Sequence, residues 1–188
     1  MISGPPRTTA GVFLVTSLAT AVGLVHPPFV RAVERSPAAL TQNEWWRLIS
    51  PILVNAHGWM QVTSNLLALA VVGVVAERLW GSRLWIAFYI AGGVAGEIAG
   101  LAWKPIGAGS SVAVCGLLGS VAVSLLACMG TRAARIGGSL ILAGGLFLTY
   151  LRDLHGPPIL VSALLAAVIL ASRRRTVLDK SKPSTATE

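Results

Sequence analysis

Charged side chains are scarce in this sequence. Asp, Glu, Lys and Arg together make up 12% of its 188 residues, and only seven residues are acidic. A soluble domain carries about 25% charged residues, whereas this chain is 54% hydrophobic and has a mean hydropathy of +0.73. The shortage of charge therefore excludes an ordinary soluble domain, and the composition predicts one polytopic membrane domain.

Cysteine is nearly absent as well. The two cysteines, Cys115 and Cys128, fall within one apolar run, where neither is placed to form a disulfide or to bind a metal. Nothing else in the sequence indicates a metal or an organic cofactor, so we expect none.

The charges that are present are mostly basic and give a net charge of +8. A basic balance can indicate nucleic-acid binding, but no patch in this chain interleaves basic and aromatic residues. Five of the fifteen basic residues lie in the C-terminal tail, where a cytoplasmic membrane surface explains them better. We therefore expect the lipid bilayer, and no nucleic acid, as a partner.

Six apolar runs predict six membrane-spanning helices, at about residues 10–26, 59–79, 84–103, 109–129, 136–151 and 157–171. Residues 1–172 then form one membrane domain with an external loop at 27–58, and 173–188 form a basic, polar cytoplasmic tail. The first run resembles a signal-peptide core, but its length favours a retained helix. The last two runs are shorter than the roughly 20 residues that cross a bilayer, which predicts local thinning or water entry near them.

The basic residues predict the orientation of these helices. With six spans both termini lie on one side, and that side collects ten basic residues against five on the other. The ten are Arg7, Arg78, Arg83, Arg132, Arg135, Arg173, Arg174, Arg175, Lys180 and Lys182. Because basic residues favour the cytoplasmic side, we expect a multi-pass cell-membrane protein with both termini in the cytoplasm. A short chain without an organelle-type presequence fits a bacterial plasma membrane.

Polar residues inside the predicted spans are few and therefore informative, because they are costly in lipid. They are Asn65, Glu97, Ser110, Ser111 and His155. The second, fourth and sixth spans all begin on the external side, so Asn65, Ser111 and His155 are expected at a common depth. Together they supply an oxyanion donor, a nucleophile and a general base.

Each of these residues also has a plainer interpretation. The Gly- and Ser-rich stretch from Gly107 to Ser120 is typical of closely packed membrane helices, and Asn65 of an interhelical hydrogen bond. His155 is also typical of an interfacial histidine beside Arg152 and Asp153. Glu97 receives no role from the sequence.

Several motifs occur along the chain in a distinctive order. They are Trp46-Arg47, His57 with Asn65, Glu77 with Gly81, Gly109-Ser110-Ser111 followed by Gly116-Leu117-Leu118-Gly119, and Asp153-Leu154-His155-Gly156. In this order they resemble the rhomboid family of intramembrane serine proteases. The resemblance implies an all-α, six-transmembrane-helix rhomboid-like bundle. It also implies a dyad of Ser111 and His155 in a water-filled cavity that cleaves transmembrane protein substrates near the external surface.

The sequence departs from the family pattern at several positions. Val112 replaces the glycine after the nucleophile, and Cys115 replaces the aromatic residue that packs on the base. Gln61 stands where a second histidine is usual, and Pro158 and Ser162 replace small residues after the base. Gln61 can still donate a hydrogen bond to an oxyanion, whereas Val112 adds bulk at a close helix contact.

The leading hypothesis is a rhomboid-type serine endopeptidase in which Ser111 attacks and His155 is the base. Asn65, the Ser111 backbone N–H and Gln61 would hold the oxyanion, and Ser110 competes with Ser111 as the nucleophile. The changes at Val112 and Cys115 motivate an alternative, a catalytically inactive pseudoprotease that binds membrane clients. A lesser alternative is a small proton-coupled transporter that uses Glu97 or Asp153.

Overall fold

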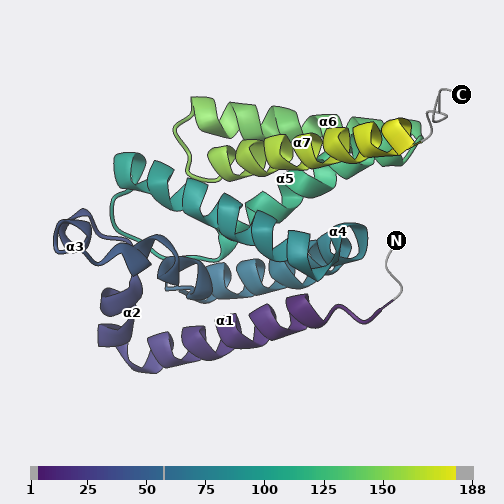
Figure 1. The fold of residues 1–188 in the computed structure, drawn as a ribbon. Helices are drawn as coiled ribbons and strands as arrows, with labels where there is room; N and C mark the ends of the chain where they lie inside the picture. The colour runs from purple at the N-terminus through teal and green to yellow at the C-terminus, as the bar shows by residue number, and fades with distance from the viewer. Residues whose placement is uncertain (1–3, 57, 181–188) are drawn as a thin grey trace, which may run out of the picture.

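The computed structural model describes residues 4–56 and 58–180, so the predicted motif residue His57 lies outside the described residues. In the described part every named element is a helix (Figure 1). The α-helices are α1 (Arg7–Val25), α2 (Pro27–Val33), α3 (Pro37–Thr41), α4 (Gly58–Trp103), α5 (Ser111–Cys128), α6 (Arg132–Tyr150) and α7 (Gly156–Lys180). Two short 3₁₀ helices, η1 (Trp45–Leu48) and η2 (Ser50–Leu53), complete the connection from α1 to α4.

Within the described residues, five helices are long and apolar enough to cross a membrane: α1, α4, α5, α6 and α7, with α7 counted through Arg175. Many of their large apolar side chains face outward, among them Leu18, Leu67, Leu140 and Leu164. Lipid can cover such surfaces, and only helices or closed barrels satisfy their backbone groups in a bilayer. The all-helical membrane bundle expected from the sequence is thus confirmed.

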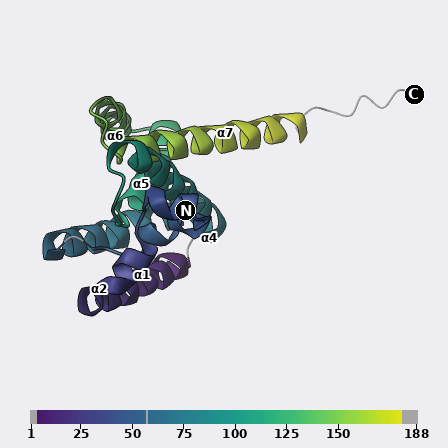
Figure 2. The ribbon, with the colours of Figure 1, turned by 90° about the vertical axis from the view of Figure 1, so that its left-hand side faces the viewer.

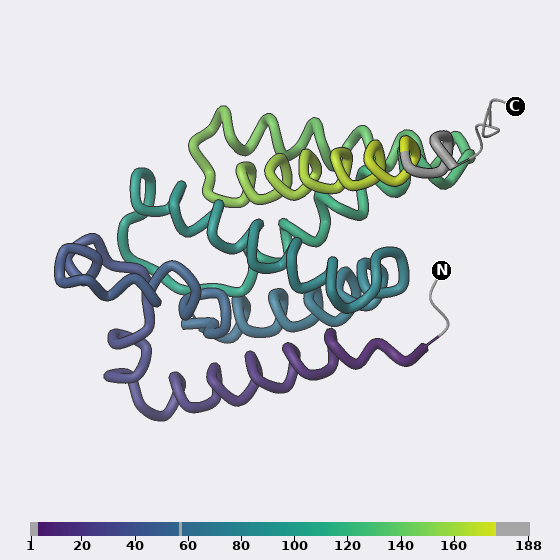
Figure 3. The backbone as a smooth tube through the Cα atoms, viewed as in Figure 1, coloured from purple at the N-terminus to yellow at the C-terminus, as the bar shows by residue number. Residues whose placement is uncertain are grey.

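Helix α4 is bent back on itself. Its 46 residues would extend about 69 Å as a straight helix, more than twice the roughly 30 Å hydrocarbon core. Gly81 interrupts the helix with φ 75° and ψ 166°, a conformation that favours glycine. Trp85 Nε1 donates to the Gly73 carbonyl at 2.9 Å, although a straight helix would hold these residues about 18 Å apart. The chain therefore reverses direction within α4 (Figure 3).

Glu77 connects the first helix to this bend. α1 has no side-chain cap of its own, because Pro6 precedes it. Instead the Glu77 carboxylate accepts hydrogen bonds from the backbone N–H groups of Thr8 and Thr9, at 2.9 and 2.7 Å. The Ser82 hydroxyl donates to the same carboxylate at 3.0 Å. Glu77 therefore satisfies the free N–H groups at the start of α1 and holds that helix against the turn in α4.

The last two helices are longer than the sequence predicted. α6 begins at Arg132, four residues before the expected start, because Thr131 caps it by accepting from the Ala134 N–H at 3.2 Å. α7 continues to Lys180, so the predicted tail at 173–188 begins as helix. No glycine or proline interrupts 172–180, and basic residues suit a helix C-terminus. Figure 2 shows this end of α7 extending beyond the other helices.

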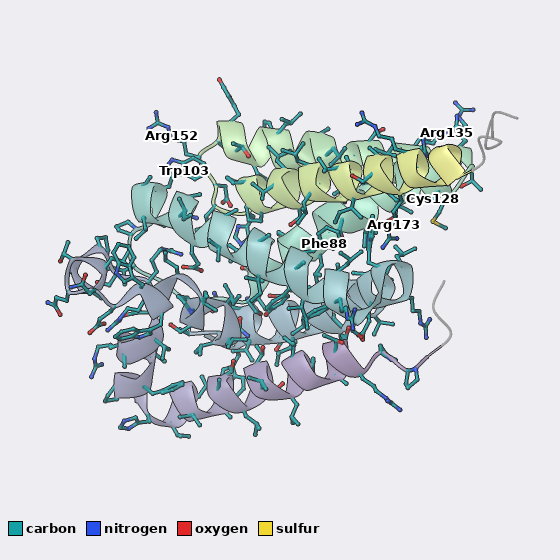
Figure 4. All side chains as sticks on the ribbon, in the orientation of Figure 1. Phe88, Trp103, Cys128, Arg135, Arg152 and Arg173 are labelled. Atoms are coloured by element: carbon teal, nitrogen blue, oxygen red, sulfur yellow. The ribbon has the colours of Figure 1, made fainter. Side chains whose placement is uncertain are left out.

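Close helix contacts form the centre of the bundle. A Cβ on Gly116 of α5 would lie 2.7 Å from Gly92 Cα of α4 and 3.0 Å from Ser162 Oγ of α7. The Ser162 hydroxyl donates to the Phe88 carbonyl at 3.3 Å, and Phe88 lies in the middle of the bundle (Figure 4). Small residues let the three helices approach closely here. Ser162, a departure from the family pattern, therefore serves this contact.

Gly116→Ala is expected to lower the free energy of unfolding by about 1–3 kcal/mol, because the added methyl group would lie 2.7 Å from both Gly92 Cα and the Phe88 carbonyl oxygen of α4. Gly144→Ala on α6 is the matched control, since nothing lies within 4 Å of its added Cβ. The control is expected to be neutral or slightly stabilising. Thermal unfolding of the purified variants in detergent measures both, and equal unfolding temperatures would contradict the close contact.

The two ends of the bundle differ in the helix ends and the residues that lie there. α1 begins and α7 ends at the same end (Figure 1). Arg135 and Arg173 lie toward that end, whereas Arg152 and Trp103 lie at the opposite end (Figure 4). The connection from α4 to α5 runs from the Trp103 end back into the bundle, where Gly107 through Ser110 are buried. This recessed connection positions the candidate site.

Candidate active site

Ser111 is the first residue of α5, and the buried connection before it is fixed by hydrogen bonds. The Gly109 N–H donates to the Pro51 carbonyl at 3.0 Å. The Ser110 N–H and hydroxyl both donate to Asn55 Oδ1, at 3.1 and 3.2 Å, and the Ser110 side chain is fully buried. Ser111, in contrast, lines a cavity. Of the two candidate nucleophiles, Ser111 is the one that lines the cavity.

His155 immediately precedes α7 and faces Ser111. Its Nε2 atom lies 2.9 Å from Ser111 Oγ, although 44 residues separate the two in the sequence. Arg152, with φ 55°, turns the chain at the end of α6, and the Gly156 N–H donates to the Asp153 carbonyl at 3.2 Å. This tight turn sets His155 at the depth of Ser111. The structure thus brings the predicted nucleophile and the predicted base within hydrogen-bond distance.

Asp153 lies on the other side of the imidazole, a contact that the sequence did not indicate. Its Oδ1 atom is 2.6 Å from His155 Nδ1 and accepts from the His155 N–H at 2.9 Å. Lys104 Nζ lies 3.6 Å from Asp153 Oδ2. Partial burial opposes ionisation of this carboxyl group, but the hydrogen bonds from His155 and the charge of Lys104 outweigh burial. They hold the pKa of Asp153 below its usual range.

The two predicted amide donors, Gln61 and Asn65, lie on the first part of α4 and converge near Gly109. A Cβ placed on Gly109 would be 3.0 Å from Gln61 Nε2, 3.7 Å from Asn65 Nδ2 and 3.6 Å from Ser111 Oγ. The Gln61 amide donates to the Ala108 carbonyl at 3.3 Å. An amide nitrogen carries two N–H groups and can donate more than one hydrogen bond. Glycine at 109 keeps this space open.

Asn55 organises the same region and was not predicted. Its Oδ1 atom accepts from Asn65 Nδ2 at 2.7 Å, in addition to the two hydrogen bonds from Ser110. Its own N–H donates to Thr20 Oγ1 of α1 at 3.1 Å. Asn55 therefore ties the Asn65 amide, the connection before Ser111 and α1 into one buried network.

A cavity of about 370 Å³ contains these groups. Its polar lining comes from Ser111, His155, Gln61, Asn65, Arg35, Glu97 and Lys104. Val112 also lines it and is almost fully buried, because Gly96 of α4 makes room for it. A Cβ on Gly96 would lie 2.5 Å from Val112 Cβ and 3.0 Å from Pro158 Cγ. The bulk of Val112 is thus accommodated by a glycine on the facing helix.

Glu97 has a structural partner in Arg35. Their side chains are 1% and 4% exposed, and Arg35 Nη1 donates to Glu97 Oε2 at 2.5 Å. Arg35 Nη2 and Nε also donate to the Lys104 carbonyl, at 2.7 and 3.2 Å. The pair ties the connection between α1 and α4 to the segment that leads to Ser111. Among residues 4–56 and 58–180, no group of three or more His, Cys, Asp or Glu side chains is placed to hold a metal ion.

The fold and the site define a helical, multi-pass membrane protein with a serine and a histidine paired at a recessed cavity. The sequence model of the rhomboid domain matches residues 42–154, more than half of the chain, which includes Asn55, Asn65, Ser111 and Asp153. The chain belongs to the rhomboid family.

Two named relatives are from Bacillus subtilis (strain 168). The chain is 40% identical to "Rhomboid protease GluP" over 83 residues, which is 44% of this chain and 16% of that protein. It is 31% identical to "Putative rhomboid protease YdcA" over 83 residues, 43% of this chain and 41% of that protein. The chain thus covers less than half the length of either relative, and both relatives are named as proteases.

Proposed function

We propose that this chain is an intramembrane serine protease that cleaves transmembrane protein substrates, with Ser111 as nucleophile and His155 as general base. The observation that carries the proposal is the 2.9 Å separation of Ser111 Oγ and His155 Nε2 at a recessed cavity. Membership of a family whose named relatives are proteases supports it.

The proposed reaction passes through an acyl-enzyme. Ser111 Oγ attacks the scissile carbonyl carbon while its proton passes to His155 Nε2. The C–N bond then breaks, and the imidazole returns the proton to the departing amine. Water enters the cavity, gives a proton to His155 and attacks the ester carbon, and the proton returns to Ser111 Oγ as the ester breaks.

Three donors are proposed to stabilise the oxyanion. The Ser111 backbone N–H lies at the start of α5, where the helix dipole favours negative charge. Asn65 Nδ2 and Gln61 Nε2 converge on the space beside Gly109. Preorganised donors of this kind act strongly in a site that excludes bulk water.

In the proposed membrane arrangement the two arms of α4 count separately, which gives six spans, and both termini lie in the cytoplasm. Gly81 divides the arms, and Arg135 and Arg173 lie toward the end at which α1 begins and α7 ends. Ser111 and His155 would then open to the external side of a bacterial plasma membrane. The lipid bilayer and a transmembrane protein substrate are the proposed partners.

A cleavage assay tests the proposed function. Wild-type protein is reconstituted in liposomes with a library of single-span peptides that carry a fluorophore and a quencher across the external half. We expect a subset of peptides to be cut in that half, with product masses that locate the cut bond. No cut peptide together with no reaction of the folded protein with a fluorophosphonate would contradict the proposed protease and favour the inactive pseudoprotease.

Gly109→Ala is expected to lower the cleavage rate by about 10²-fold, comparable to the loss of one oxyanion donor. The added methyl group would occupy the space on which Gln61 and Asn65 converge. Gly130→Ala is the control, because nothing lies within 4 Å of its Cβ. Initial cleavage rates at matched unfolding temperature measure the effect, and an unchanged rate would contradict the proposed oxyanion site.

A further inference from the structure

We propose that Asp153 is a positioning residue that fixes the tautomer and orientation of His155, so that the site works as a Ser-His-Asp triad. The inference rests on the proposed function of Ser111 and His155. It goes beyond the dyad implied by the family resemblance. The geometry that carries it is a continuous chain, from Ser111 Oγ to His155 Nε2 at 2.9 Å and from His155 Nδ1 to Asp153 Oδ1 at 2.6 Å.

The chemistry of the carboxylate determines the tautomer. An ionised carboxylate can only accept hydrogen bonds, so the proton of the neutral imidazole must lie on His155 Nδ1, facing Asp153. His155 Nε2 then presents its lone pair to Ser111 Oγ, and the hydroxyl donates to it. This is the arrangement that a general base requires, and the proton taken from Ser111 stays on the imidazole and does not pass to Asp153.

The carboxylate itself is held on both oxygens. Oδ1 accepts from the His155 N–H, which closes a local turn two residues long, and Oδ2 lies 3.6 Å from Lys104 Nζ. Oδ1 also contacts His155 Nδ1, so one carboxylate oxygen contacts both the backbone and the ring of His155. These two contacts fix the ring relative to the start of α7.

This chain needs such a device at His155. The family resemblance leads to the expectation of an aromatic ring that packs on the base, and Cys115 stands at that position. A cysteine side chain offers no ring face against which an imidazole can stack. The Asp153 carboxylate instead orients the imidazole through its contact with Nδ1, on the edge of the ring away from Ser111.

Asp153→Asn removes the charge of the side chain but keeps the local turn, because the amide oxygen can still accept from the His155 N–H. The measured quantity is the second-order rate of reaction with a fluorophosphonate, in which Ser111 Oγ bonds to phosphorus, fluoride leaves and His155 takes the proton. We expect a fall of roughly 10–100-fold at an unchanged unfolding temperature. That range lies at or below the ~10²–10⁴-fold of general-base catalysis, because Asp153 is 29% exposed.

Two further variants sharpen the test. Asp153→Glu restores a carboxylate and is expected to recover at least part of the lost rate. Glu34→Gln removes a carboxylate outside the cavity lining and is expected to react at the wild-type rate. Two results would overturn the positioning role. One is a wild-type reaction rate in Asp153→Asn, and the other is a rate in Asp153→Glu no higher than that in Asp153→Asn.

The tautomer of His155 can be determined without measuring catalysis. Nitrogen-15 NMR of histidine-labelled protein, with the His155 signals assigned by His155→Ala, is expected to show the proton on Nδ1 in the wild type. In Asp153→Asn we expect the Nε2–H form to be populated. If the wild type fails to react with the probe, the proposed protease function fails, and the NMR result still decides the role of Asp153. An Nε2–H tautomer in the wild type would overturn that role.

Discussion

Ser111→Ala is expected to abolish reaction with fluorophosphonates and to lower peptide cleavage by about 10⁴–10⁶-fold, the range for a lost catalytic serine. The hydroxyl is the atom that attacks in the proposed mechanism, and it lies 2.9 Å from the imidazole that would take its proton. Its removal leaves only oxyanion stabilisation and binding, which alone give modest catalysis.

His155→Ala is expected to match this loss, because an unactivated serine hydroxyl is a weak nucleophile. The double variant of Ser111 and His155 is expected to be no worse than either single variant, since the two residues act as one unit. Ser124→Ala is the control and is expected to retain wild-type activity, because this buried serine lies on the same helix but does not line the cavity. Losses that add in the double variant would contradict a shared step.

Arg35→Met is expected to lower the free energy of unfolding by about 3–5 kcal/mol, the usual loss when one partner of a buried ion pair is removed. The substitution would leave the Glu97 carboxylate, which is 1% exposed, without its 2.5 Å partner. It would also remove two hydrogen bonds to the Lys104 carbonyl. The connection that leads to Ser111 should loosen, so cleavage should fall as well.

The double variant Arg35→Met, Glu97→Leu separates the buried charge from the lost hydrogen bonds. Removing both charges is expected to recover much of the stability, because no unpaired carboxylate then remains. Thermal unfolding in detergent measures the single and double variants side by side. Equal unfolding temperatures for wild type and Arg35→Met would contradict a buried pair. A transporter that uses Glu97 as its proton site would instead lose proton flux in Glu97→Gln.

The sequence was sufficient to predict four of the seven polar residues that line the cavity, namely Gln61, Asn65, Ser111 and His155. Apolar runs set the helices, and their alternating direction placed Asn65, Ser111 and His155 at one depth. The structure brings Ser111 and His155 to 2.9 Å and sets Asn65 beside the same cavity. These features follow from helix length and chain direction, which periodicity and hydropathy report well.

The residues that support the site were missed for a physical reason. Asn55 and Arg35 lie in the connection between α1 and α4, where no hydrophobic pattern fixes the path of the chain. Arg35 was one of the five basic residues counted on the side away from the termini. Its partner Glu97 lies 62 residues away, so the sequence did not indicate the pair. Asp153 precedes His155 by two residues, a spacing that allows the turn seen here. Its use depends on the direction that the chain takes at Arg152.

The helix ends were also only partly predictable. The sequence separated the two arms of α4 into apolar runs at 59–79 and 84–103, and Gly81 between them adopts the positive φ that the reversal requires. The end of α7 was placed too early, because the Arg-Arg-Arg run was interpreted as a tail. Arginine is a good helix former, and the helix continues through it to Lys180.

Mass spectrometry of the fluorophosphonate adduct tests the assignment of the nucleophile most directly. Folded wild-type protein is reacted with the probe in lipid, digested and sequenced through the peptide that contains Ser110 and Ser111. We expect one adduct per chain, on Ser111 Oγ, and none in His155→Ala. An adduct on Ser110 would contradict the assignment of Ser111 as the nucleophile. No adduct on the folded wild-type protein would contradict the proposed serine protease.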